Sequence, residues 1–355
     1  MVKKRDFGPD LVRAVACIFV LAVHFYMYTG FYKQPYSGGV MMVSVPIRMA
    51  LMTCVPMFLI LTGYLCLKKS WSTGYYRALL PTIIGYILCG LVIIAFKDIK
   101  YGIKLSFLEI IQSLLDYSAV PYGWYVEMYI GLFLISPFIN AAWKALEKNA
   151  RFALLVSVFF ISCAPSVLNY KYQLIPEFWT STYPVAYYLL GVWLKEYPVK
   201  IKKIWLLLGW LLMTGLCCIV QYDLFSESAF VFSTTNYWSS IFVFGESFFL
   251  FSFLISFKGE KLPRPVMWTL RRIALLSFPL FMLSYIGDAL IYTKLKAFCP
   301  DLRSFLPYHV PIVIVNLILS AVLAQIVDWA TKGIMKLIPE HIRRKKSEET
   351  NEAKG

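Results

Sequence analysis

The sequence predicts an all-α, polytopic integral membrane protein with about ten transmembrane helices and both termini in the cytoplasm. One observation behind this prediction is composition, because 59% of the residues are apolar and only 15% are charged. Soluble domains contain about 45–50% apolar and about 25% charged residues. A second observation is that the apolar residues form blocks of about twenty, the length that a helix needs to cross the hydrocarbon core. The third is the distribution of basic residues between these blocks.

The apolar blocks define the predicted spans. An amphipathic segment at 103–117 separates the third block from the fourth, and we expect it to lie in the membrane interface instead of crossing the bilayer. Residues 1–340 form one predicted transmembrane domain, and the charged tail at 341–355 is expected to be disordered. The predicted spans are 11–31, 45–67, 78–96, 122–139, 152–168, 182–194 (the shortest), 204–222, 238–257, 273–292 and 310–330.

The formal net charge of +15 comes from short clusters of Lys and Arg that lie between the apolar blocks. This placement indicates membrane topology and argues against a nucleic acid partner. With both termini inside, the inner segments contain 25 Lys and Arg residues and the outer segments contain 9, with Arg48 of the second span counted among the 9. Cytoplasmic segments of membrane proteins carry such an excess of basic residues. The count therefore predicts an even number of spans with both termini inside.

The cysteines and the N-terminus exclude some other classes. Seven of the eight cysteines lie in or at the ends of apolar blocks, and there is no CxxC motif and no Cys/His cluster, so neither a metal site nor a disulfide framework is predicted. The basic start MVKKRDFGPD resembles that of a signal peptide. However, the apolar run after it is too long and lacks a convincing cleavage site, so we expect a retained first helix.

The first predicted helix contains two ionisable residues, Arg13 and His24, that share one face. They are eleven residues apart, which is three helical turns plus about 20° and an axial distance of about 16 Å. Asp10 lies one turn before Arg13 on the same stripe. In the predicted topology, Arg13 lies at the cytoplasmic end and His24 lies near the middle of the membrane.

This pair combines a guanidinium at the cytoplasmic end with an imidazole at depth. Arginine suits phosphate recognition, and a histidine can accept the proton of a reacting hydroxyl. Taken alone, Arg13 is better explained as a positive-inside residue that reaches the headgroups. The alternative for His24 is a hydrogen-bonded contact between helices. We favour a functional His24, because it is the only histidine deep in a predicted span and ionisable groups there are costly.

Five further segments carry recognisable patterns, and with the first helix they make six elements in order. They are VPMFLILTGYLCL (55–67), YYRALLP (75–81), GWYVEMYIGLFLISP (123–137), YYLLGVWLKE (187–196) and LSFPLFMLSY (276–285). In these segments, and in the Arg13–x10–His24 spacing preceded by Asp10, the chain resembles the acyltransferase 3 family of membrane acyltransferases. The resemblance runs from about residue 6 to about residue 330.

Two positions depart from the family pattern, and a fused domain is missing. Thr62 replaces a serine, and Ser284 stands where many members have a histidine, so a second catalytic histidine is not carried over. Some members also have a fused extracellular hydrolase-like domain. Without it, this chain is expected to act through its membrane part alone or to pass the acyl group to another protein.

The resemblance implies transfer of an acyl group, most often acetyl from acetyl-CoA, to a hydroxyl of a surface or lipid-linked carbohydrate. It implies a multi-pass protein of a bacterial plasma membrane, whose partners are the lipid bilayer, acyl-CoA and the carbohydrate, with no metal. Arg13 and Arg77 would then bind the phosphates of the coenzyme. His24 would deprotonate the acceptor hydroxyl.

The acceptor side is assigned to Trp124 and Glu127, because an aromatic ring next to an acid suits a sugar ring and its hydroxyls. Glu127, Glu246 or Asp288 could hold the His24 imidazole in one tautomer. Alternatively, neighbouring polar groups satisfy each of these acids, and Asp288 is hydrated near the outer end of its helix. Asn316 is expected to make a hydrogen bond between helices.

Two other classes of function remain open. A proton-coupled transporter or exporter of a polysaccharide or lipid-linked sugar could use the same buried acids and His24 as a relay. The sequence lacks the repeats typical of such proteins, although Pro279 and Gly287 are expected to interrupt the ninth span. A catalytically silent scaffold of a polysaccharide assembly complex is the third class, and it predicts that His24 tolerates substitution.

Overall fold

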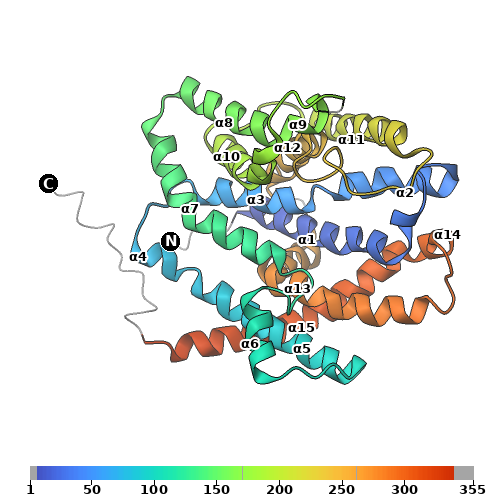
Figure 1. The fold of residues 1–355 in the computed structure, drawn as a ribbon. Helices are drawn as coiled ribbons and strands as arrows, with labels where there is room; N and C mark the ends of the chain where they lie inside the picture. Colours follow the sequence, from blue (N-terminus) through green and yellow to red (C-terminus); the bar gives the residue numbers. More distant parts are fainter. Residues whose placement is uncertain (1–5, 170, 261, 340–355) are drawn as a thin grey trace.

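The computed structural model describes residues 6–169, 171–260 and 262–339, and in these residues the chain forms helices and no β-strand. The helices pack side by side into a bundle whose long axis is horizontal in Figure 1. The tail predicted at 341–355 lies outside the described residues.

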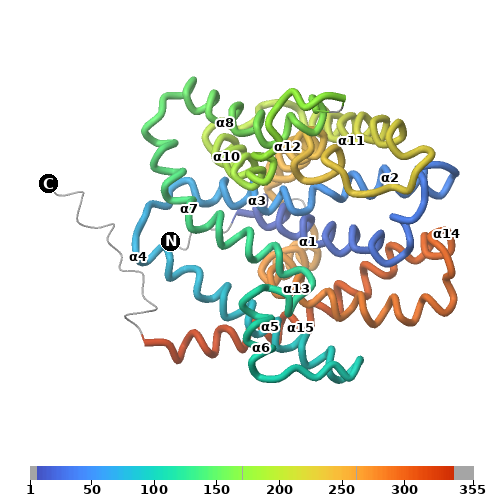
Figure 2. The backbone as a smooth tube through the Cα atoms, viewed as in Figure 1, coloured from blue at the N-terminus to red at the C-terminus, as the bar shows by residue number. Residues whose placement is uncertain are grey.

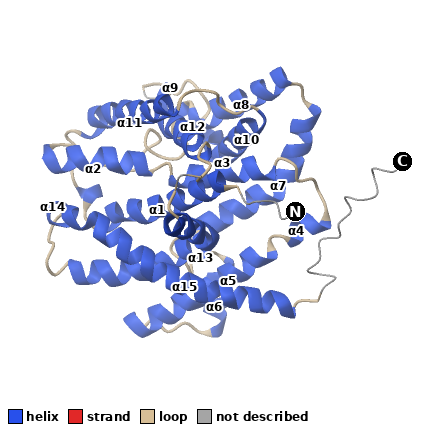
Figure 3. Ribbon diagram, turned by 180° about the vertical axis from the view of Figure 1, so that it is seen from behind, coloured by secondary structure: helices blue, strands red, loops and turns tan. Residues whose placement is uncertain are grey.

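The central element of the bundle is α1 (Phe7–Tyr28). It packs against α13 (Arg264–Leu295) on one side and against α3 (Cys54–Cys66) on the other, and it also contacts α12 (Ile241–Ile255) and α15 (His309–Leu337). Figures 1, 2 and 3 show α1 between these neighbours from opposite sides. Most of its residues are buried. The sequence pair Arg13 and His24 therefore lies in the interior of the bundle.

Each of the ten predicted spans coincides with a helix or with two consecutive helices. The remaining ones are α2 (Gly38–Leu51), which precedes α3, then α5 (Leu80–Tyr101), α7 (Trp124–Ala145), α8 (Lys148–Cys163) with α9 (Pro165–Leu168), α10 (Tyr183–Glu196) and α11 (Lys203–Phe225). The connections contain η1 (Phe31–Lys33), α4 (Thr73–Arg77), α6 (Phe107–Leu115), η2 (Glu177–Thr182), α14 (Leu302–Phe305) and η3 (Leu306–Tyr308).

Seven helical segments in the described part of the chain are long and apolar enough to cross a membrane. This confirms the all-α class for the described residues, with several helices that could cross a membrane. A membrane-spanning helix needs about 20 residues. The helices of three predicted spans are shorter than this, since α8, α10 and α12 have 16, 14 and 15 residues. The total of ten spans stays a prediction.

The second predicted span is broken into α2 and α3 at Met52 and Thr53. Pro56 explains the break, because its ring would clash with the carbonyl of Met52, four residues earlier, in a continuous helix. Proline is tolerated in the first turn of a helix, where its missing N–H is not needed. The break gives α2 and α3 separate contacts, with α2 packing against α11 and α3 against α10.

The ninth predicted span is not interrupted. Pro279 and Gly287 lie within α13, which is one helix of 32 residues. The expectation that these two residues break the span was therefore wrong. Proline removes a single helical hydrogen bond, and the close packing of α13 against α1 and α15 supports the turns on either side of it.

The short helix α10 is held by close backbone packing against α3. A Cβ atom at Gly63 would overlap the carbonyl oxygen of Tyr188, and a Cβ atom at Gly191 would overlap that of Ile60. Small residues let two membrane helices approach in this way. Ten of the 14 residues of α10 are buried, so α10 is an interior helix for which burial in protein, not in lipid, explains the apolar sequence.

The predicted interfacial segment at 103–117 contains α6. Ser106 and Glu109 form a capping box at its start, and no residue of α6 is buried. Phe107, Leu108 and Leu115 are each about three-quarters exposed. This apolar surface fits the predicted position in the interface.

The two ends of the bundle differ in what they contain. The start of α1 and the end of α15 lie at the same end, on the left of Figure 1, and α14 lies at the opposite end. We call these the inner end and the outer end of the bundle. Assignment of the inner end to the cytoplasm remains a prediction from the count of basic residues.

We predict that α8, α10 and α12 each cross the membrane, so that consecutive connections before and after these helices lie on opposite sides of the membrane. In intact cells, a membrane-impermeant maleimide should label Tyr172→Cys and Glu227→Cys, whose side chains are exposed in outer connections. Lys200→Cys, in an inner connection, should react only after permeabilisation. The wild-type protein is the control for labelling of its own cysteines. Reaction of positions 172 and 200 from the same side would show that α10 does not cross.

Candidate functional site

The site is built on the face of α1 that carries Arg13 and His24. Arg13 lies in the second turn of α1 and is half-buried, and His24 is buried four residues before the helix ends at Tyr28. His24 therefore lies near the outer end of α1, and its position near the middle of the membrane stays a prediction. The axial distance of about 16 Å between the two residues thus separates an inner and an outer part of the site.

His24 contacts Asp288 of α13. The Nδ1 atom of His24 lies 3.3 Å from Oδ2 of Asp288, and both side chains are buried. The two atoms are not aligned as a hydrogen bond, since Nδ1 has no partner within hydrogen-bond geometry. Catalytic hydrogen bonds are often poorly aligned before substrate binds. The expectation that Asp288 is hydrated was wrong, because its exposed fraction is 1%.

The Asp288 carboxylate accepts two well-aligned hydrogen bonds from other elements. The Tyr122 hydroxyl donates to Oδ2 at 2.7 Å, and Nδ2 of Asn316 on α15 donates to Oδ1 at 2.8 Å. The Tyr28 hydroxyl lies 3.0 Å from that of Tyr122. Because Tyr122 donates its proton to Asp288, Tyr28 is the donor in this pair. A buried carboxylate is costly unless such donors satisfy it.

A glycine next to Asp288 permits the bond from α15. A Cβ atom at Gly287 would overlap Oδ1 of Asn316. The Asn316 side chain is held from both sides, because its amide also donates to the Ser284 carbonyl at 3.2 Å and its oxygen accepts from Ser320 at 2.8 Å. The expected bond of Asn316 between helices is therefore present, and its partner is the carboxylate that contacts His24.

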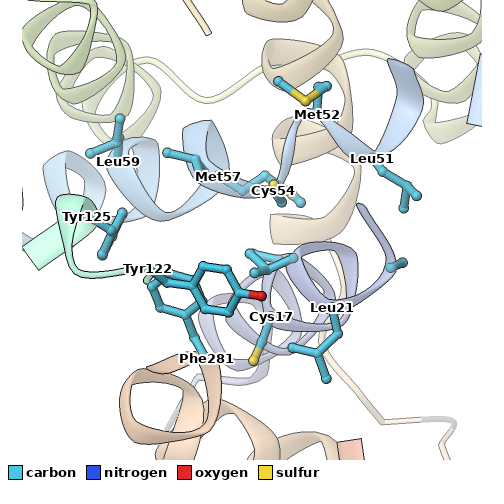
Figure 4. Close-up of a cluster of buried hydrophobic side chains, with 14 of the residues drawn as sticks. Cys17, Leu21, Leu51, Met52, Cys54, Met57, Leu59, Tyr122, Tyr125 and Phe281 are labelled. Atoms are coloured by element: carbon cyan, nitrogen blue, oxygen red, sulfur yellow. The ribbon is translucent and has the colours of Figure 1, made fainter. Parts of the chain in front are cut away.

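Stacked rings fix the imidazole plane. The rings of His24 and Tyr122 lie 4.0 Å apart at 26°, and Tyr122 stacks on Phe281 of α13 at 5.8 Å and 20°. Figure 4 shows Tyr122 and Phe281 together, next to Cys17 and Leu21 of α1. His24 is thus oriented by a carboxylate at one ring atom and by an aromatic face.

A cavity of about 170 Å³, the inner cavity, extends along α1 from Arg13 towards His24. It is bounded by α1, α3, α5, α7 and α13, and its polar side chains carry five hydroxyls and one guanidinium. The lining residues are Arg13, Val20, Val55, Phe58, Leu61, Thr62, Thr82, Tyr125, Tyr129, Ser277, Phe278 and Phe281.

The inner cavity ends next to the His24 cluster. Val20 lies one turn before His24 on α1, and Phe281 lines the cavity while its ring stacks on Tyr122. His24 does not line the cavity itself. The first helix therefore presents Arg13 to the cavity and His24 to the aromatic and acidic groups at the far side of the Phe281 ring.

Asp10, the third residue of the stripe, faces α13. Its carboxylate is buried and lies 3.8 Å from Nε of Arg271. This contact links the inner ends of α1 and α13 close to Arg13, which is three residues away along α1. Of these charged groups, Arg13 is the one that lines the inner cavity.

The other predicted site residues lie outside the inner cavity. Arg77 ends α4 at the inner end of the bundle and is half-buried, but it does not line the cavity. Trp124 begins α7 and stacks on Trp238 at 4.5 Å. Glu127 is exposed and lies two residues from Tyr125, so it faces away from the cavity wall that Tyr125 forms. Substrate binding by these residues stays a prediction.

Two further buried groups lie apart from the His24 cluster. Glu246 on α12 is completely buried and interacts electrostatically with the buried guanidinium of Arg48 on α2. His309, the first residue of α15, is also buried, and its Nε2 lies 3.0 Å from the Ala22 carbonyl. Of the three acids considered for His24, the structure brings Asp288 to it.

Sequence reasoning missed Tyr122, Tyr28 and the buried Arg48. Tyr122 was hidden because it precedes α7, in a segment where tyrosines are expected as interface anchors. Arg48 could have been found by the criterion that selected His24, because an ionisable residue within a membrane span is a functional candidate. No local pattern could have paired Tyr122 with Asp288, which lies 166 residues away.

Within the described residues, no group of three or more His, Cys, Asp or Glu side chains could hold a metal ion. A model of the acyltransferase 3 family, described as an acyltransferase domain, matches residues 6–325. No curated protein and no solved structure matches the chain. The matched range includes Arg13, His24, Tyr122, Asp288 and Asn316.

Proposed function

The chain belongs to the acyltransferase 3 family, and we propose that it moves an acyl group, acetyl above all, from cytoplasmic acyl-CoA to a hydroxyl of a cell-surface or lipid-linked carbohydrate. The observation that carries this proposal is the buried contact between His24 and Asp288, 3.3 Å apart, near the outer end of the helix that presents Arg13 to the inner cavity. A base and a cation are thus held at two depths of one helix.

His24 is the general base in this proposal. If the imidazole carries its proton on Nδ1, the atom 3.3 Å from Asp288 Oδ2, the Nε2 atom carries the lone pair that can take a proton. The acceptor hydroxyl oxygen bonds to the thioester carbonyl carbon as Nε2 takes the hydroxyl proton. The carbon–sulfur bond then breaks, and the imidazolium returns this proton to the thiolate of coenzyme A. The products are an ester and a free thiol, and His24 is neutral again.

Asp288 is a positioning residue for His24. It holds the Nδ1 proton in place and stabilises the imidazolium that forms, as a carboxylate does in hydrolase triads. Tyr122 and Asn316 fix the carboxylate by hydrogen bonds of 2.7 and 2.8 Å. The ring of Tyr122, stacked on His24, removes the freedom of the imidazole to turn away.

Arg13 binds the coenzyme phosphates in this proposal. The phosphates and the thioester lie at opposite ends of acyl-CoA, so a cation and a base separated by about 16 Å along α1 suit the two ends. The guanidinium offers a planar fork of donors for a phosphate. The aromatic and aliphatic wall of the inner cavity suits the part of acyl-CoA that joins the phosphates to the thioester. The location that follows is a plasma membrane, with the inner end of the bundle in the cytoplasm.

We expect His24→Ala to lower the rate of acyl transfer by about 10²–10⁴-fold, because the acceptor hydroxyl loses its base. Purified protein in vesicles is given [14C]acetyl-CoA together with a lipid and glycan extract from a strain that lacks the gene. The measurement is the label transferred to this extract. His309→Gln is the matched control, a second buried histidine outside this machinery, and should keep transfer within about threefold of wild type. Unchanged transfer by His24→Ala would contradict the role of the base. Accumulation of unreacted label inside the vesicles would favour the transporter.

Asp288→Asn should lower kcat at least about tenfold and leave KM for acyl-CoA nearly unchanged. The introduced amide favours the tautomer in which the proton sits on Nε2, so the base atom is lost. Asp328→Asn, the same change in a surface contact with Lys332, is the control. A rise in KM without a fall in kcat would indicate that Asp288 binds substrate instead of orienting His24.

Arg13→Gln should raise KM for acyl-CoA by about 10–100-fold, since a hydrogen bond to a charged group contributes about 1.5–3 kcal/mol. The value of kcat should change little, because the phosphates are bound equally in the ground state and the transition state. Arg264→Gln, an exposed arginine at the inner end, should behave as wild type. A fall in kcat at unchanged KM would show that Arg13 acts on the reacting atoms.

A further inference from the structure

A second, larger cavity lies on the other side of the His24 cluster from the inner cavity. It has a volume of about 570 Å³ and lies between α5, α6, the segment before α7 and α13. We call it the outer pocket. Its lining includes Lys97, Tyr101, Glu109, Ser118 and Tyr285. The proposed transfer reaction does not yet use any of these groups.

The outer pocket adjoins Tyr122, the ring that stacks on His24. Tyr285 lies one turn before Asp288 on α13, and its ring packs edge-on against that of Tyr122 at 6.3 Å. Ser118 precedes Tyr122 by four residues in the segment that leads into α7. The ring of Tyr122 thus packs against Phe281 of the inner cavity and against Tyr285 of the outer pocket, with His24 stacked on it.

The polar lining of the outer pocket suits a hydroxyl-rich ring. The Lys97 ammonium lies 3.2 Å from the Ala119 carbonyl and 5.7 Å from the centre of the Tyr285 ring, and an ammonium has three donors. The Ser106 N–H donates to the Glu109 carboxylate at 2.7 Å and lowers the pKa of this carboxyl, so it is an anion at neutral pH. Donors, acceptors and tyrosine faces are therefore combined in one wall.

The size and position of the outer pocket suit the headgroup of a lipid. Pockets for small molecules have volumes of about 300–1,000 Å³, and 570 Å³ lies within this range. The α6 helix, which forms one wall, exposes Phe107, Leu108 and Leu115. The sequence predicts that this apolar face lies at the boundary between headgroups and acyl chains. A sugar attached to a lipid would enter the pocket at the depth where its carrier lies.

We propose that the outer pocket binds the sugar residue that accepts the acyl group, presented as the headgroup of a lipid-linked glycan. This inference rests on the proposed function and adds the place and the class of the acceptor. Donor and acceptor then reach His24 from opposite sides, the donor through the inner cavity and the acceptor through the outer pocket, and the Tyr122 ring separates the two spaces.

Filling the outer pocket tests this inference. Ser118→Trp keeps the backbone N–H that donates to Asp116 at 2.9 Å and adds a bulky ring to the cavity. We expect it to lower label transfer from [14C]acetyl-CoA to the lipid extract of a deletion strain at least tenfold, with [3H]coenzyme A binding within twofold of wild type. Gln112→Trp, on the exposed face of α6 outside the pocket lining, is the matched control and should keep both values.

A second variant separates loss of the acceptor from a folding defect. Lys97→Met should raise the concentration of lipid extract needed for half-maximal transfer at least fivefold and leave the half-maximal concentration of acetyl-CoA unchanged. Lys104→Met, an exposed lysine outside the pocket lining, should change neither. Wild-type transfer by both Ser118→Trp and Lys97→Met would overturn the assignment of the outer pocket.

Two further outcomes of the label-transfer assay test whether the acceptor sugar is attached to a lipid and whether the protein transfers acyl groups. Transfer of label only to glycan that contains no lipid would overturn the lipid-linked acceptor. No transfer by the wild-type protein to either fraction would overturn the proposed function, and the acceptor assignment with it. Wild-type transfer together with unaffected pocket variants would leave the function standing and remove only the acceptor site.

Discussion

The Asp288 carboxylate is the group on which the site depends, because it is buried and its partners come from several elements. His24 comes from α1, Tyr122 from the segment before α7 and Asn316 from α15. A carboxylate in an apolar interior is costly unless donors surround it, so the helices that supply these donors must meet at this point. The need to satisfy one buried acid therefore fixes the relative position of three helices and the orientation of the imidazole.

This constraint also explains features that look independent in the sequence. Gly287 has no side chain because the Asn316 amide occupies the space where a Cβ atom would lie. The long, unbroken α13 carries Arg271 and Ser277 at its inner part and Tyr285 and Asp288 at its outer part, so one rigid helix connects both spaces of the proposed reaction. Because α1 packs along it, the distance from Arg13 to His24 is set by helix geometry and not by a flexible loop.

Two cavities on either side of a ring cluster suit a reaction whose substrates arrive from opposite faces of a membrane. The inner cavity presents a guanidinium and a largely apolar wall. The outer pocket presents an ammonium, a carboxylate and tyrosine faces. In the proposed reaction, only the acyl group has to pass from one space to the other.

The sequence by itself determined the helical class, the approximate positions of the long apolar helices and the pairing of Arg13 with His24 on one helical face, because helix period and apolar length are local properties. Two details of the helices predicted from the sequence were wrong. The second span is broken at Met52 because of Pro56, and the ninth span, expected to be interrupted at Pro279, is one continuous helix because of its packing. Only the tertiary structure decided that Asp288, and neither Glu127 nor Glu246, lies at His24, and that Tyr122 joins them. The physical reason is that these contacts join residues far apart in the chain, and packing between helices, which no local period encodes, selects them.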